Sequence, residues 1–250
     1  LTFQTGFSYR TLESASPTFS LDYYTDIANN VVKSDVKQSE VSFQIEYAPK
    51  RRTIGYAVER EIVDSPYSRF FVNYSHGFKG LLDSDFQYDK LQLYYKQPII
   101  IGPLGRSNVI IEVGKTFGTV PLGLMSVIPG NQTFFTIENT FSNLNYYEFV
   151  SDEYATLQWN HNFGGRLFSR IPFMRKLNWR EIVAVKGVYG SISDENRAIN
   201  ASGLTYNAPE KGYWEYSAGL FRVDFAWRGN YLNTPDTNKF TVKASFGFNF

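Results

Sequence analysis

The final twelve residues of the chain, 239–250, alternate without a break between large apolar side chains and small or polar ones. Apolar residues occupy every second position from Phe240 onward, and Lys243 is among the residues between them. A period of two is typical of a β-strand whose two faces meet different surroundings. We therefore expect a strand with its large side chains against an apolar medium and its polar side chains against a wet one.

The composition of the whole chain favours a sheet embedded in a membrane. Of the 250 residues, 18% are aromatic and 20% are charged, and the mean hydropathy is −0.30. This combination is typical of strands that give alternate residues to lipid and to a polar interior. No apolar run approaches the roughly 20 residues that a transmembrane helix needs. A closed barrel would satisfy every backbone amide without such helices.

Alternating or aromatic-rich segments recur along the chain, and turn sequences separate them. Clear examples are 41–47 and 155–160, in which apolar and polar residues change places at each step. We predict an all-β fold, an antiparallel transmembrane β-barrel with about 12 strands in this chain, forming one domain over 1–250. The expected strands are about 1–10, 17–26, 38–49, 52–63, 67–79, 85–99, 107–117, 149–163, 180–192, 212–219, 220–229 and 238–250.

Strand parity assigns the connections to two sides. Bacterial barrels place the C-terminus and their short turns in the periplasm and their longer loops outside the cell. Counting back from Phe250 predicts that 118–148, 193–211 and 230–237 are extracellular and that 100–106 and 164–179 are periplasmic. The connection 118–148 is about thirty residues long, a length that usually signals function or filling of the interior.

Several segments resemble known outer-membrane proteins. The terminal strand resembles the closing strand of outer-membrane barrels, which implies that these residues form an assembly signal: Phe240, Val242, Phe246, Phe248 and Phe250. A long loop between the fifth- and sixth-last strands resembles the lumenal loop of the superfamily of BamA and the two-partner-secretion transporters. More closely, 118–121, 129–131, 145–152 and 170–181 resemble a Bacteroidota outer-membrane family of unassigned function, which joins a carboxypeptidase-regulatory-like N-terminal domain to a barrel.

This resemblance carries implications for the chain and for the loop. It implies that the chain is the C-terminal part of a 16-stranded barrel, with four strands and a periplasmic region outside it. The Val-Arg-Gly-Phe tip of the superfamily's loop is absent from 118–148, and Pro129-Gly-Asn131 stands in its place. The arginine chemistry of that tip is therefore not transferred to this chain.

The loop 118–148 is rich in aromatic residues and poor in charged ones. A solvated loop would be more polar, so we favour packing inside the barrel mouth over an extracellular flap. Glu148 and Asp152, where the loop meets the next strand, can pair with an inward arginine, cap loop amides, or be solvated at the rim. The candidate lumen residues are Pro121, Pro129, Gly130, Asn131, Tyr146, Tyr147, Glu148 and Asp152.

Segment 165–179 mixes basic and bulky apolar residues without the period of a strand. Pro172 permits a short helix that begins there. We favour a periplasmic interfacial anchor, in which the apolar residues meet the membrane boundary and the cations reach head groups, over a docking surface for a partner. Its candidate residues are Arg170, Pro172, Phe173, Arg175, Lys176 and Trp179.

The sequence gives little support to catalysis. It has two histidines, His76 and His161, and no cysteine, and shows no clustered acid/base or Ser-His arrangement. Ser75 precedes His76, but neighbours on a strand point to opposite faces. No phosphate-binding loop or metal-ligand spacing is present. We expect no enzyme, no catalytic residue, no metal and no cofactor. The net charge of +1 gives no sign of a nucleic-acid partner.

Three function classes remain open. We expect an assembly-factor-type outer-membrane barrel that acts in protein insertion or translocation, or as a subunit of an envelope complex. The alternatives are a passive or substrate-selective channel and a barrel that only scaffolds a partner. The expected partners are outer-membrane lipid and other outer-membrane or periplasmic proteins.

Overall fold

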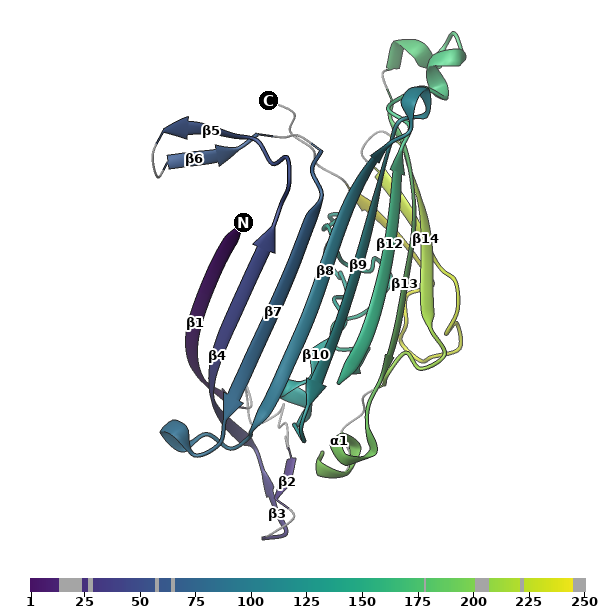
Figure 1. Ribbon diagram of the computed structural model, residues 1–250. Coiled ribbons are helices and arrows are strands. Elements are labelled where there is room, and N and C mark those ends of the chain that lie inside the picture. Colours follow the sequence, from purple (N-terminus) through teal and green to yellow (C-terminus); the bar gives the residue numbers. More distant parts are fainter. Residues whose placement is uncertain are drawn as a thin grey trace.

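The predicted all-β, antiparallel fold is confirmed. The structure, a computed structural model, describes residues 1–13, 24–26, 29–56, 59–63, 66–177, 179–200, 207–220 and 223–244. One curved antiparallel sheet dominates it, and its spatial order is β1-β4-β7-β8-β9-β12-β13-β14-β15-β16 (Figure 1). These strands are β1 (Thr2–Glu13), β4 (Asp35–Tyr47), β7 (Arg69–Phe78), β8 (Tyr88–Ile100), β9 (Arg106–Phe117), β12 (Glu153–Asn162), β13 (Glu181–Ser191), β14 (Tyr213–Leu220), β15 (Val223–Arg228) and β16 (Phe240–Ala244).

The main sheet has ten strands rather than about 12, because two predicted strands fold outside it. Residues 24–26 form β2 (Tyr24–Asp26), which pairs with β3 (Val31–Lys33) as a small hairpin. The predicted strand 52–63 turns back on itself as β5 (Thr53–Tyr56) and β6 (Glu59–Ile62). Both hairpins project from the ends of the sheet (Figure 1). A period of two cannot distinguish one long strand from two short strands that pair with each other.

The expected closed barrel is not present among the described residues. The sheet is curved, and β1 and β16 are its two edges, with no pairing between them in the described part of the chain. Within the same residues, no helix has the length and hydropathy needed to cross a membrane.

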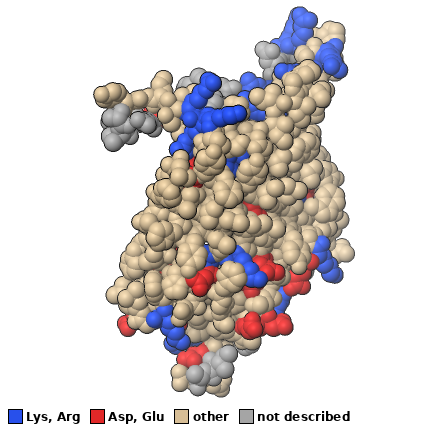
Figure 2. All heavy atoms as spheres, viewed as in Figure 1, with Lys and Arg blue, Asp and Glu red and all other residues tan. Residues whose placement is uncertain are grey.

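The outer face of the sheet is apolar and exposed. Cross-strand register places aromatic and aliphatic side chains next to one another on consecutive strands: Tyr47, Phe70, Tyr95, Ile111 and Leu157. All five are exposed. On the face that Figure 2 shows, charged side chains gather toward the two ends, and few lie between them.

The inner face is polar and hydrogen-bonded. Asn73 Nδ2 donates to Gln92 Oε1 (3.1 Å), and Gln92 Nε2 donates to the Tyr154 hydroxyl (3.0 Å). The Tyr154 hydroxyl donates in turn to Glu112 Oε1 (2.6 Å). Gly114 on β9 allows this arrangement, because a Cβ there would lie 2.4 Å from the Tyr154 ring. The sheet is therefore inverted relative to a water-soluble one, since its polar side is the enclosed side.

The buried core lies between this inner face and the connection that follows β9. One cluster contains Val120, Leu124 and Met125 of that connection together with residues such as Tyr24 and Ile199. A second contains Ile128, Phe141, Leu144 and Phe149 of the connection packed on Tyr154, Val188 and Tyr213 of the sheet.

The connections divide between the two ends of the sheet (Figure 1). The lower end in that view carries β2 and β3, the turn η1 (Leu81–Asp83), and α1 (Asp194–Ile199). The upper end carries β5 and β6 and the turns η2 (Gly102–Leu104), η4 (Phe168–Arg170) and η5 (Met174–Leu177).

Candidate functional site

Residues 118–149 run along the inner face of the sheet and are called the inner loop here. The loop enters through η3 (Leu122–Leu124) and β10 (Ser126–Val127), and β10 pairs with β11 (Val150–Ser151) where the loop leaves. Gly130 forms an isolated bridge with Phe141, so the two arms of the loop touch. A Cβ at Gly130 would lie 2.5 Å from the Leu144 carbonyl oxygen, so this contact requires glycine.

One row of inward charged residues holds the middle of the inner loop. Lys186, Glu215 and Arg228 lie directly opposite one another on β13, β14 and β15. Lys186 Nζ donates to the Thr140 carbonyl oxygen (2.6 Å). The Glu215 carboxylate accepts from the backbone N–H groups of Ser142 (2.7 Å) and Asn143 (3.0 Å).

Arg228, the third residue of this row, contacts Glu148, the loop carboxylate that the sequence analysis singled out. Arg228 forms an ion pair with Glu148, and their side chains are 0% and 7% exposed. Arg228 also lies over the ring of Tyr213, 4.9 Å from its centroid. Of the uses that the sequence left open for Glu148, the structure shows two: it pairs with an inward arginine, and its Oε2 accepts from the loop amide of Asn145 (2.9 Å).

The tip of the inner loop reaches the edge strand β16. Lys243 Nζ donates to the carbonyl oxygens of Asn131 (2.8 Å) and Thr133 (2.7 Å). The backbone of Ala244 accepts from the Thr136 N–H (2.8 Å) and donates to the Phe134 carbonyl oxygen (2.7 Å). These two bonds form a parallel bridge between Phe135 and Ala244, so the tip lies against the backbone of β16.

The same loop also contacts the opposite wall. Lys96 on β8 forms an ion pair with Glu138 (2.8 Å). The inner loop therefore spans the interior from β8 to β16. Lys96 and Glu138 are partly exposed, whereas the Arg228–Glu148 pair is buried. Because a buried charge is expensive unless it is paired and hydrogen-bonded, the buried pair depends on both partners remaining in place.

Asp152 lies between β11 and β12 at the end of the sheet. Through Asn196, its hydrogen bonds connect the last residues of the inner loop to the first ones. Its carboxylate accepts from the Ser193 N–H (2.8 Å), the Ser193 hydroxyl (2.6 Å) and Asn196 Nδ2 (2.7 Å). Asn196 Oδ1 accepts from the Val120 N–H (2.7 Å). Burial acts to raise the pKa of Asp152, but the hydrogen bonds from Ser193 and Asn196 outweigh it and hold the pKa below its usual range.

The remaining predicted loop residues divide between buried and exposed positions. Pro121 and Asn131 are buried, and Asn131 closes a turn by donating from Nδ2 to the Phe135 carbonyl oxygen (2.8 Å). Pro129 is exposed. Tyr146 and Tyr147 are also exposed, with their rings in edge contact at 5.0 Å.

The sequence did not identify the residues that hold the loop. These are Lys96, Lys186, Glu215, Arg228 and Lys243. The sequence shows that each is a charged residue on the polar face of an aromatic-rich strand. This pattern does not show which loop the charged side chain contacts.

The terminal strand is described as far as Ala244. Phe240 and Val242 are exposed on the outer face, whereas Lys243 is buried on the inner face. Phe246, Phe248 and Phe250 lie outside the described residues.

The basic segment 165–179 projects from the upper end of the sheet between β12 and β13 (Figure 1), and Figure 2 shows its cations in blue at the top of the molecule. The helix expected from Pro172 is instead two short 3₁₀ turns, η4 before the proline and η5 after it. Pro172 removes one backbone donor and restricts the residue before it, so the two turns do not merge.

The side chains of this segment are largely open to the surroundings. Phe173 is 78% exposed, and Arg170, Arg175 and Lys176 are exposed as well. The ring of Trp179 meets that of Phe168 edge-on. The segment therefore presents cations and a bulky apolar side chain together at one end of the sheet.

The two histidines are part of hydrogen-bond networks on the sheet. His161 is buried, with Nδ1 2.7 Å from the Ser107 hydroxyl and Nε2 3.0 Å from the Leu104 carbonyl oxygen. His76 Nδ1 lies 2.7 Å from Asp89 Oδ1, a pair that only the register of β7 and β8 reveals. Among the described residues, no group of three or more potential ligands could hold a metal ion.

Comparison with known proteins gives a family match. Residues 34–195, more than half of the chain, match the C-terminal domain of a family of unknown function, DUF5686. The matched region includes the inner loop and Asp152, and it ends within α1, just before Asn196. No curated protein matches the chain.

Proposed function

The chain belongs to the DUF5686 family through its C-terminal domain, and we propose that it is an integral outer-membrane β-barrel of assembly-factor type. In this proposal it acts in the insertion or translocation of other proteins, or as a subunit of an envelope complex. The observation that carries the proposal is the inverted sheet, apolar outside and polar inside, with a long loop held against its inner face.

The outer face supports a membrane location. Soluble monomers rarely expose contiguous apolar patches larger than a few hundred Å². Here apolar side chains follow one another in register across at least five strands, from Tyr47 to Leu157. A lysine facing lipid at the bilayer midplane would cost about 2–4 kcal/mol, and Lys243 lies on the opposite, inner face.

The inner loop favours an assembly or envelope-complex role over a permanently open pore. It spans the interior from Lys96 to Lys243. A fixed loop across the lumen opposes free diffusion, whereas a held loop can be released when a partner binds. In this proposal the curved sheet is part of a closed barrel.

The channel alternative has one observation in its favour. A cavity of about 200 Å³ lies between the inner loop and the wall, and its lining is mixed aromatic and polar: Arg69, Phe71, Gln92, Tyr94, Glu112 and Asn139. A selective channel would use such a lining to recognise a solute.

The membrane part of the proposal is tested by spin labels on neighbouring residues of β12. Leu157 is exposed on the outer face and Gln158 is buried on the inner one. Because the sequence has no cysteine, Leu157→Cys and Gln158→Cys each give a single labelling site. In lipid vesicles, the label at 157 should be reached by dissolved oxygen and shielded from a water-soluble nickel relaxant. Equal access of the nickel relaxant to a label at 157 in vesicles and in a urea-unfolded sample would refute the membrane assignment.

The assembly part needs a separate measurement. Depletion of the protein from cells should lower the folded, heat-modifiable fraction of other outer-membrane barrels. If their folded fraction stays constant, and the purified protein conducts ions in planar bilayers, the channel alternative replaces the assembly role.

A further inference from the structure

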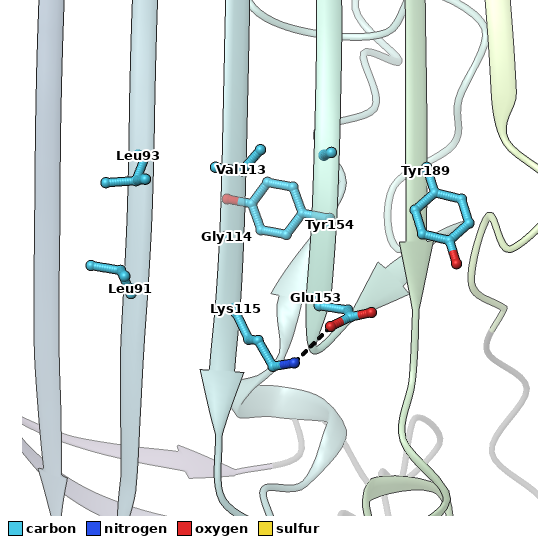
Figure 3. A pocket seen from close by; sticks show the side chains of 9 residues that line it. Leu91, Leu93, Val113, Gly114, Lys115, Glu153, Tyr154 and Tyr189 are labelled. Atoms are coloured by element: carbon cyan, nitrogen blue, oxygen red, sulfur yellow. Dashed lines mark hydrogen bonds and ion pairs between the residues drawn. The ribbon is translucent and has the colours of Figure 1, made fainter.

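A hollow of about 290 Å³ lies on the outer face, over β8, β9, β12 and β13 (Figure 3). It arises at Ala155, which stands opposite Val113 on one side and Tyr189 on the other. The alanine methyl group is smaller than either neighbour, so a space remains between them. Leu91 and Leu93 of β8 complete the apolar wall.

The lower rim of the hollow is polar. Lys115 Nζ and Glu153 Oε2 form an ion pair of 2.8 Å, and both side chains remain about half exposed. Glu153 Oε1 also accepts from the Ser191 hydroxyl (3.0 Å). Figure 3 shows the Tyr189 ring directed toward the same end of the sheet, with its hydroxyl leading.

The hollow therefore combines an apolar part and a charged part, as an amphiphilic ligand does. Its apolar wall lies toward the middle of the sheet and its charged rim toward the end that carries α1. Lysine binds phosphate as a point charge, while the Glu153 carboxylate and the Tyr189 hydroxyl can bond the hydroxyl groups of a head group. An acyl chain in the hollow would bury apolar surface that the sheet otherwise leaves as a gap.

We propose that this hollow is a binding site for one phosphate-bearing membrane lipid whose head group carries hydroxyl groups, with the phosphate at Lys115 and one acyl chain against Ala155. The inference rests on the proposed membrane location. It adds a defined lipid contact on one part of an otherwise general apolar face.

The test uses native mass spectrometry of the folded protein in mild detergent, titrated with dipalmitoyl phosphatidylglycerol. The parent should bind one lipid more tightly than any further ones. Ala155→Phe should weaken that first binding by about tenfold, the effect of excluding about two methylene groups from an apolar contact. Lys115→Gln should weaken it for phosphatidylglycerol and leave binding of a neutral diacylglycerol unchanged.

The matched control is Ala218→Phe, because Ala218 is also an exposed alanine on the outer face, on β14. It should bind lipid as the parent does. The proposal is overturned if Ala155→Phe and Ala218→Phe have the same affinity, or if Lys115→Gln binds phosphatidylglycerol as the parent does. Failure of the membrane assignment would look different, because the parent itself would then not insert into phosphatidylcholine vesicles.

Discussion

Arg228 and Glu148, eighty positions apart in the sequence, form an ion pair on the enclosed side of the sheet, with the arginine side chain 0% exposed. The arginine belongs to β15 and the glutamate to the last turn of the inner loop. The pair joins the loop to the sheet at a buried place where water cannot hydrate either charged group in the partner's stead. A strong dependence of the fold on both partners follows.

Removing one partner of this pair should destabilise the protein. Glu148→Gln leaves the buried guanidinium without its counter-charge, a change that typically costs about 3–5 kcal/mol. The measurement is the midpoint of urea unfolding of the detergent-solubilised protein, followed by loss of the heat-modifiable band. Glu138→Gln is the matched control, since Glu138 also pairs with a lysine but is largely exposed, and it should cost about 0–1 kcal/mol. Equal midpoints for the two variants would contradict the structural role of the buried pair.

The loop tip should be open to covalent attachment to β16. Phe135 and Ala244 are partners in a parallel bridge, and bridge partners lie at Cα distances that suit a disulfide. In this cysteine-free chain, the double substitution Phe135→Cys and Ala244→Cys should form a disulfide on air oxidation, detected by mass and by gel mobility.

The control for this attachment shifts the loop cysteine by two residues, pairing Ile137→Cys with Ala244→Cys. This pair should oxidise more slowly, because residue 135, and not residue 137, is the bridge partner of Ala244. A faster disulfide at 137 than at 135 would show that the tip does not rest on β16 in this register.

Asp152 should make stability depend on pH in the acid range. Burial raises its pKa, but the hydrogen bonds from Ser193 and Asn196 lower it further than burial raises it. Its contribution is therefore present above the unfolded value, about 3.9, and is lost as the pH falls through the lower folded value. Asp152→Asn should be less stable than the parent by about 1.5–3 kcal/mol near neutral pH.

This difference should shrink at low pH, as measured by unfolding midpoints across the acid range. Asp194→Asn, on the neighbouring helix α1, is the control. The idea fails if that variant reproduces the same pH dependence.

The terminal strand should be sensitive to charge on its apolar face. Phe250→Asp should reduce the folded yield in outer-membrane fractions, because it places a charge at the membrane boundary and removes the aromatic end of the predicted assembly signal. Asn249→Asp, one residue earlier and on the polar face, should be mild. The measurement is the heat-modifiable folded band of both variants, and a parental yield for Phe250→Asp would refute the assembly-signal interpretation.

The basic segment should meet the membrane surface. Phe173→Cys, labelled with a bimane fluorophore, should be quenched by brominated phospholipid in vesicles, because exposed apolar and cationic residues together favour the interface. The same label without brominated lipid is the control. If bromination has no effect on the fluorescence, the segment faces water, and the alternative of a docking surface for a partner gains support.

The sequence by itself determined the class of the fold and the two faces of its strands, because a period of two is a local property that ten or so residues display completely. Phe240 and Val242 share a face that excludes Lys243 whatever the strand pairs with. The aromatic composition of 118–148 likewise indicated a loop too apolar for water. Local pattern did not reveal that 52–63 folds back on itself, since one long strand and two short ones have the same alternation.

Only the tertiary structure decided which inward residues act together. Lys186, Glu215 and Arg228 are separated by 29 and 13 positions in the sequence, and the register of β13, β14 and β15 alone sets them in one row facing Thr140, Ser142 and Glu148. The same holds for His76 opposite Asp89 and for the hollow at Ala155. Register depends on contacts across the whole sheet and on where the inner loop packs, and a slip of one residue would turn each of these side chains to the other face.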